Sequence, residues 1–178
     1  ALESGDLAAY DAIVAGVRAY NTRSRLAPLA GRLADYVAAG GTLVVQYATD
    51  RGLVVEPVGP VPLTLTRNRV TDEDSPVAII LPEHPVLNTP NRITATDFAG
   101  WEQERGLYFA GERDPRFAAP LAMNDPGEAP LDGGLVVARH GRGHFAYTGL
   151  AFFRQLPAGV PGAYRLFVNL LSLEAADE

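Results

Sequence analysis

Two groups of side chains in this 178-residue sequence have types and spacings that suit acid–base or metal chemistry. Glu102 and Glu104 stand two positions apart, so in an extended segment they would share one face and could act as an acid–base pair. His140 and His144 flank a short glycine loop and could face each other across a hairpin as two ligands of a metal ion. Both groups support the hypothesis of a small hydrolase. The alternatives are a mixed-charge segment and two partly exposed turn histidines.

The usual catalytic nucleophiles are missing from the sequence. It contains no cysteine, which excludes a cysteine nucleophile, a disulfide framework, a Cys-ligated zinc and an iron–sulfur cluster. All 15 basic residues are arginine, so Schiff-base chemistry and a P-loop lysine are excluded as well. No serine stands in a Gly-x-Ser-x-Gly motif. We therefore expect a binding domain rather than an enzyme, without a cofactor of its own.

Trp101 and Arg105 flank the two glutamates and suggest a ligand surface. The flat apolar face of a tryptophan is suited to stacking on a sugar ring, and Arg105 is counted with Trp101 among the candidate ligand-binding residues. The alternative is that Trp101 anchors the core.

Composition limits the classes of partner. The chain is 47% hydrophobic and 20% charged with a net charge of −6, as in an ordinary globular domain without the excess of cations that nucleic-acid binding requires. No apolar run approaches the roughly 20 residues that span a bilayer. We expect one domain over residues 1–178, with neither nucleic-acid nor membrane partners. The compartment is left open, since a cytoplasmic or an exported protein fits equally.

The first 47 residues predict a βαβ unit. Residues 12–17 form a continuous apolar run of strand length, typical of a strand covered on both faces. Apolar residues between positions 26 and 39 follow helical spacing, and Gly40 with Gly41 ends the helix before a second strand at 42–47. Such units are almost always right-handed crossovers between parallel strands.

The rest of the sequence predicts short strands, a hairpin and a closing helix. Strand patterns occur at residues 63–66, 77–81, 107–110 and 120–123. Residues 134–139 and 144–148 predict a hairpin around a glycine loop, and helical spacing covers residues 159–173.

The predicted parallel strands place several side chains at one edge of the sheet. In an open α/β sheet, ligands bind beyond the carboxyl ends of the strands. The loops after the strands at 12–17 and 42–47, and the segment after the last strand, should meet there. The candidate binding residues at this edge are Arg18, Asn21, Arg23, Gln46, Tyr47 and Arg154.

Two sets of motifs resemble known families. The helix end Tyr36–Val44 with its Gly-Gly pair, the segment Glu83–Leu87 with its His-Pro pair, and the segment Gly141–Leu150 resemble class I glutamine-amidotransferase-like domains of the ThuA-like branch. The segments Gly100–Phe109 and Phe153–Arg165, with others along nearly the whole chain, are similar to the C-terminal part of long bacterial PIG-L/LmbE-type deacetylases.

The resemblance implies a flavodoxin-like α/β domain: a three-layer sandwich with a mostly parallel central sheet and a C-terminal antiparallel hairpin. It also implies that the chain is part of a longer protein, whose upstream zinc-dependent N-acetylsugar deacetylase domain would be its partner, with a carbohydrate-like small molecule as ligand. Association with a second copy is an alternative partnership. The amidotransferase cysteine is absent, so we expect a degenerate, non-catalytic accessory domain.

Overall fold

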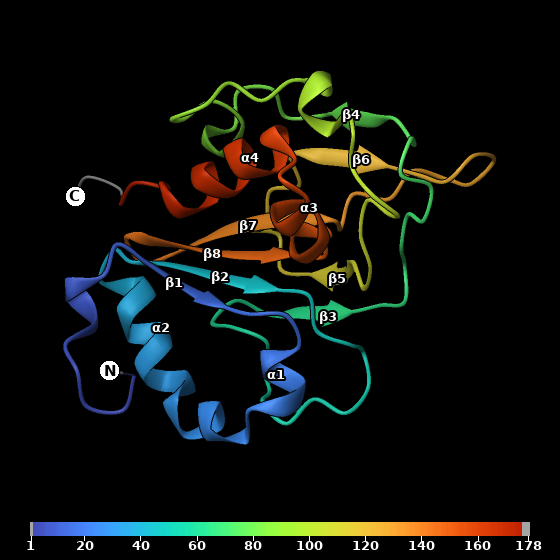
Figure 1. Ribbon diagram of the computed structural model, residues 1–178. Helices are drawn as coiled ribbons and strands as arrows, with labels where there is room; N and C mark the ends of the chain where they lie inside the picture. The colour runs from blue at the N-terminus through green and yellow to red at the C-terminus, as the bar shows by residue number, and fades with distance from the viewer. Residues whose placement is uncertain (1, 176–178) are drawn as a thin grey trace.

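The centre of the protein is a four-stranded β-sheet in a computed structural model that describes residues 2–175 (Figure 1). The strand order is β1-β2-β8-β7. β1 pairs with β2, and β2 with β8, in parallel, whereas β8 and β7 form an antiparallel hairpin. The strands are β1 (Ala12–Ala15), β2 (Thr42–Gln46), β7 (Leu135–His140) and β8 (Gly143–Thr148). The predicted parallel start and closing hairpin are both confirmed.

Each face of the sheet has its own hydrophobic core. Successive side chains of a strand point to opposite faces. Val44 and Ala146 therefore belong to one core, and Leu43 and Phe145 to the other. All four are almost completely buried. The two central strands are consequently apolar along their length, as expected for a sheet covered on both sides.

Helices on both faces complete three layers (Figure 1). α2 (Ala30–Ala38) packs through Leu33 and Val37 on the face of Leu43, beside the short α1 (Ala19–Thr22). α3 (Phe152–Ala158) and α4 (Pro161–Leu171) lie on the opposite face. The architecture is the expected flavodoxin-like three-layer sandwich. Within residues 2–175, no helix combines the length and the apolar character that crossing a membrane requires.

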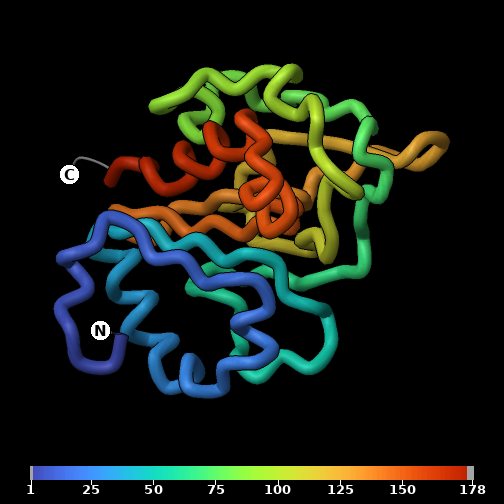
Figure 2. Tube along the Cα trace, viewed as in Figure 1, coloured from blue at the N-terminus to red at the C-terminus, as the bar shows by residue number. Residues whose placement is uncertain are grey.

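Two antiparallel strand pairs from the middle of the chain extend the two cores. β3 (Leu63–Leu65) pairs with β5 (Ala110–Arg113) and packs in the α2-side core. β4 (Val77–Ile79) pairs with β6 (Leu121–Met123) in the α4-side core. Figure 2 shows the chain passing from one side of the sheet to the other between β3 and β4.

The first predicted helix is divided into two kinds of helix. Residues Ser24–Leu29 form a 3₁₀-helix that contains Pro28, and the α-helix begins only at Ala30. Proline has no N–H to donate and clashes with the preceding turn, so it belongs at the start of an α-helix rather than inside it. The predicted start at residue 26 is therefore wrong by one turn.

Two predicted strands differ from the observed ones. β1 ends at Ala15 and lies at the edge of the sheet, where Val14 is 38% exposed, so it is not covered on both faces as predicted. The strand predicted at 107–110 begins only at Ala110. Tyr108 has a left-handed backbone (φ 53°), which cannot continue a strand.

Candidate functional site at the carboxyl edge of the sheet

The carboxyl ends of β1, β2 and β8 lie at one edge of the sheet because these strands are parallel. Arg18 follows β1, Tyr47 follows β2, and Phe153 lies in the first turn of α3, just after β8. The main-chain N–H of Arg18 donates to the carbonyl oxygen of Tyr47 (2.8 Å), which joins the first two loops. The structure thus brings several of the candidate residues together at this edge.

Three aromatic rings and one guanidinium meet there, and we call Tyr47, Tyr108, Phe153 and Arg154 the edge cluster. The rings of Tyr47 and Tyr108 are stacked, with centroids 5.7 Å apart and planes inclined by 15°. The ring of Phe153 lies 5.3 Å from that of Tyr47 at an inclination of 57°. The guanidinium carbon of Arg154 is 5.0 Å from the centre of the Phe153 ring, within cation–π range. All four residues are half-buried.

A carboxylate holds the arginine of the edge cluster in place. Arg154 Nε donates to Glu104 Oε1 (2.7 Å), and the Glu104 side chain is only 12% exposed, against 36% for Arg154. Gln155, fully buried in α3, accepts from the Glu102 N–H (2.8 Å) and donates to the Glu102 carbonyl (2.9 Å). The segment that carries Glu104 is therefore attached firmly to α3.

Left-handed backbone conformations occur within the edge cluster and in residues close to it in the chain. Arg18 (φ 57°), Gln103 (φ 67°) and Tyr108 (φ 53°) are the non-glycine residues with positive φ in the described chain. An L-residue in this conformation costs about 1 kcal/mol, so surrounding contacts must maintain it. One such contact is the hydroxyl of Tyr147, which donates to the Tyr108 carbonyl (2.6 Å). Strained residues of this kind gather at functional sites.

Glu102 and Glu104 do not form the acid–base pair proposed from their spacing. The pairing requires a strand, but residues 101–109 lie outside the named strands, and Gln103 turns the chain between the two glutamates. Glu102 is exposed, whereas Glu104 is buried under Arg154. The two carboxylates therefore lack a common face.

Trp101 and Arg105 lie in the core rather than at a ligand surface. Trp101 is 3% exposed, its Nε1–H donates to the carbonyl of Asp97 (3.1 Å), and its ring packs against Phe98 and Phe152. Arg105 donates from Nε to the carbonyl of Ser75 (2.9 Å), and burial lowers its pKa. The expectation that Trp101 stacks on a sugar is replaced by the alternative of a core anchor.

His140 and His144 lie on opposite faces of the hairpin. The register pairs His144 with Arg139, so these two side chains share one face of the hairpin. His140 is the next residue after Arg139 in β7, and neighbouring residues of a strand point to opposite faces. Among residues 2–175, no three His, Cys, Asp or Glu side chains converge on a position for a metal ion. Burial lowers the pKa of His144, and the positive charge of Arg139 lowers it further.

The other candidate residues at the carboxyl edge have structural or peripheral positions. The Asn21 side chain accepts from the N–H of Thr49 (2.9 Å) and donates to its carbonyl (3.2 Å), which closes the loop after β2. Gln46 is the half-buried last residue of β2. Arg23 is exposed at the end of α1.

Two members of the edge cluster were not among the candidate binding residues. Phe152 and Phe153 look alike in the sequence, but consecutive helical residues point about 100° apart. Phe152 therefore enters the core, while Phe153 reaches the edge. Tyr108 has a left-handed backbone, and its ring stacks on Tyr47 from a different loop, a contact that no local sequence pattern predicts.

Comparisons with known proteins identify the fold. No protein-family model and no curated protein matches the sequence. A cytoplasmic protein from Salmonella typhimurium has a similar structure, with a TM-score of 0.61 and 19% identity over 96% of this chain and 74% of that one. A second one from Salmonella typhimurium LT2 has a TM-score of 0.58 and 15% identity, over 94% of this chain and 73% of that one.

A longer protein contains a similar unit. A cold-adapted β-galactosidase from Rahnella sp. R3 matches with a TM-score of 0.50 and 17% identity, over 95% of this chain but only 24% of its own. At such identities the likeness extends to the fold alone: this chain has an α/β fold that occurs in proteins of different lengths.

Proposed function

We propose that the chain is a non-catalytic accessory domain that binds a carbohydrate at the edge cluster, within a longer N-acetylsugar deacetylase of the PIG-L type. The observation that carries the proposal is the composition of the carboxyl edge. Folds of this class bind ligands there. In this chain the edge presents Tyr47, Tyr108 and Phe153 beside an anchored arginine.

The chemistry of the edge cluster suits a sugar. Aromatic rings pack against the apolar C–H faces of a pyranose, and a guanidinium has five N–H donors for hydroxyl or acetamide oxygens. Glu104 accepts from Arg154 Nε, which leaves the Nη groups of the guanidinium to face a ligand. The pairing also orients the guanidinium before a ligand arrives, which reduces the entropic cost of binding.

Neither a cysteine nor a serine belongs to the edge cluster. The sequence has no cysteine, and Tyr47 follows the central strand β2. Among the described residues, Ser75 is buried beside Arg105, and Ser172 lies after α4, so neither joins the edge cluster. This supports a role in holding a ligand rather than transforming it.

The accessory role draws support from the size of the unit. In the β-galactosidase, a unit of this fold makes up about a quarter of a longer polypeptide. The resemblance of this sequence to the C-terminal part of PIG-L-type deacetylases suggests the same arrangement here, with the catalytic domain upstream. The ligand would then be an N-acetylated sugar related to the substrate of that domain.

Isothermal titration with N-acetylglucosamine tests the proposal. We expect saturable binding that Tyr47→Ala weakens about fivefold, since a lost stacking contact is worth about 1 kcal/mol. Tyr164→Ala removes a tyrosine that is 48% exposed on α4 and provides the matched control, which should bind as the wild type does. Absence of binding, or equal weakening by both substitutions, contradicts the proposal.

A further inference from the structure

The outer edge of strand β1 is open. The N–H of Thr42 in β2 donates to the carbonyl of Asp11 (3.1 Å), so the odd-numbered residues of this segment direct their main-chain groups toward β2. The main-chain groups of Ala12 and Val14 consequently point away from the sheet, and within residues 2–175 they have no hydrogen-bond partner on that side. In Figure 1, β1 borders the sheet between the α2 and α4 layers, with no other segment drawn across it. The edge is therefore free to pair with another strand.

The strand β1 is covered on its α2 side but not on its α4 side. Ile13 and Ala15 pack against the α2-side core. Val14 pairs with Val44 and points with it to the α4 side, where Val14 is 38% exposed. Tyr10, just before the strand, is 49% exposed. The strand itself carries no charged residue, although charges are a common means of protecting an open edge from pairing.

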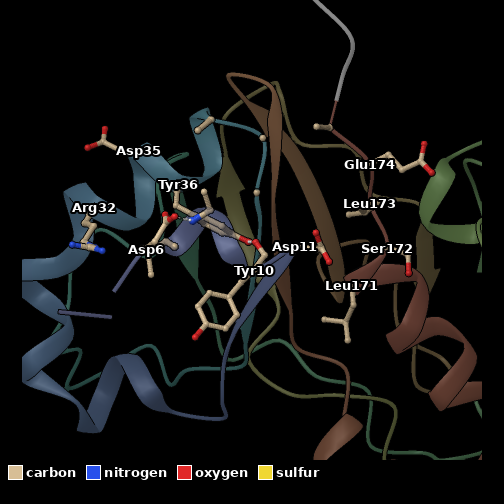
Figure 3. A pocket seen from close by; sticks show the side chains of 16 residues that line it. Asp6, Tyr10, Asp11, Arg32, Asp35, Tyr36, Leu171, Ser172, Leu173 and Glu174 are labelled. Atoms are coloured by element: carbon tan, nitrogen blue, oxygen red, sulfur yellow. Dashed lines mark hydrogen bonds between the residues drawn. The ribbon is translucent and has the colours of Figure 1, made fainter. Parts of the chain in front are cut away.

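A row of apolar side chains on α4 continues this exposed surface. Tyr164, Val168 and Leu171 are spaced four and three residues apart, so they share one face of the helix. Tyr164 and Val168 are strongly exposed. Leu171 and Tyr10 line the same cavity at the amino end of the sheet, and Figure 3 shows both beside Asp11. This face of α4 therefore lies toward the open edge, and we define the β1 patch as Tyr10, Val14, Tyr164, Val168 and Leu171.

We propose that the β1 patch joins two copies of this chain, whose β1 strands pair antiparallel across a two-fold axis. Such an axis matches a surface with itself, and when it runs perpendicular to the sheet it sets two identical edge strands antiparallel. The outward groups of Val14 then bond to those of Val14 in the second copy, which continues the sheet from one copy into the other. The same axis keeps both α4 helices on one face of the joined sheet, with their apolar rows toward each other.

The charges at the two ends of β1 match this arrangement. Asp11 precedes the strand and Arg18 follows it, both are exposed, and neither belongs to an ion pair within residues 2–175. Antiparallel pairing centred on Val14 brings Asp11 of each copy close to Arg18 of the other. Charges at the rim of an interface set its orientation and its partner more than its affinity. A second copy therefore complements the open edge in hydrogen bonding, in apolar surface and in charge.

Sedimentation equilibrium of the full chain tests the inference. We expect the wild type to be a dimer at about 100 µM. Val14→Lys places a charge at the centre of the interface, and Val168→Lys does so on α4 without altering the strand; each should weaken association by about tenfold or more. Ile80→Lys is the matched control, because Ile80 is 46% exposed after β4, outside the β1 patch, and it should leave association unchanged. Circular dichroism checks that each variant is folded.

Charge reversal tests the antiparallel orientation. Asp11→Arg and Arg18→Asp should each weaken association about three- to tenfold, and the double variant should recover the affinity of the wild type. A double variant that associates no more tightly than the single ones would overturn the inference.

Two other results would also overturn it. One is a wild type that is monomeric at about 100 µM, which would leave the β1 patch to another occupant, such as a further domain of the same polypeptide. The other is equal weakening by Ile80→Lys and by the two substitutions in the patch. The edge cluster shares no residue with the β1 patch, so sugar binding and dimer formation succeed or fail independently.

Discussion

The hydroxyl of Tyr147, fully buried on β8, donates a hydrogen bond to the main-chain carbonyl of Tyr108 (2.6 Å). It also accepts a longer bond from the N–H of Ala48 (3.5 Å). Burial raises the pKa of Tyr147, so this hydroxyl keeps its proton at neutral pH. One side chain of the sheet therefore attaches both the loop after β2 and the left-handed residue whose ring stacks on Tyr47.

Removing that hydroxyl should destabilise the protein. Tyr147→Phe leaves the part-buried carbonyl of Tyr108 without this donor, and we expect a loss of about 1–3 kcal/mol in the free energy of unfolding. Urea denaturation measures it. The control is Tyr164→Phe, because the exposed Tyr164 of α4 donates its hydroxyl to the Leu156 carbonyl of α3. This substitution should change the free energy of unfolding by less than about 0.5 kcal/mol. Similar losses in both variants would contradict the role of Tyr147.

Phe152 and Phe153 should separate stability from binding. Phe152 is fully buried between Trp101 and Phe167, so Phe152→Ala should cost about 3–5 kcal/mol of unfolding free energy. Phe153→Ala truncates a half-buried ring and should cost clearly less, yet weaken sugar binding. Thermal denaturation and sugar titration of the two variants give the comparison. A Phe153→Ala protein with unchanged sugar affinity would exclude Phe153 from the binding site.

Glycine at position 18 should relieve backbone strain. Arg18 is exposed with φ 57°, so Arg18→Gly should leave stability unchanged or raise it by up to about 1 kcal/mol. The matched control is Arg23→Gly, because Arg23 is also exposed but has φ −116°. Glycine there should lower stability by about 0.5–1 kcal/mol. If both substitutions destabilise equally under urea, the strain at Arg18 is not real.

Acid should destabilise the protein partly through two histidines. Burial lowers the pKa of His84 and of His144 below the ordinary 6.5, so below that pH the unfolded chain binds more protons than the folded one. The free energy of unfolding is therefore unaffected by these histidines above pH 6.5, and it falls as the pH decreases from 6.5 toward their lowered pKa values. The urea midpoint of His144→Gln should fall less between pH 7.5 and 5.5 than that of the wild type. An equal fall of the urea midpoint in His144→Gln and in the wild type would contradict the prediction. The control substitution is His140→Gln, at the other histidine of the hairpin.

The sequence alone predicts the layers of this fold but not the details of its site. Apolar runs and helical spacing locate β2 and α4, because their side chains pack in a periodic way against the sheet. The ring stack of Tyr47 and Tyr108 joins residues 61 positions apart and depends on one left-handed backbone angle. No local sequence pattern predicts the ring stack or the left-handed angle. A second left-handed residue, Gln103, turns the chain between Glu102 and Glu104, so the pairing that their spacing suggests does not form.

The central claim is that the carboxyl edge of the sheet holds a sugar. Titration of ¹⁵N-labelled protein with N-acetylglucosamine, followed by two-dimensional NMR, tests it most directly. We predict saturable shifts confined to the amides around Arg18, Tyr47, Tyr108 and Phe153, with little change near Tyr10 and Glu174 at the opposite end. Spectra that do not change, or shifts concentrated away from the carboxyl edge, would contradict it.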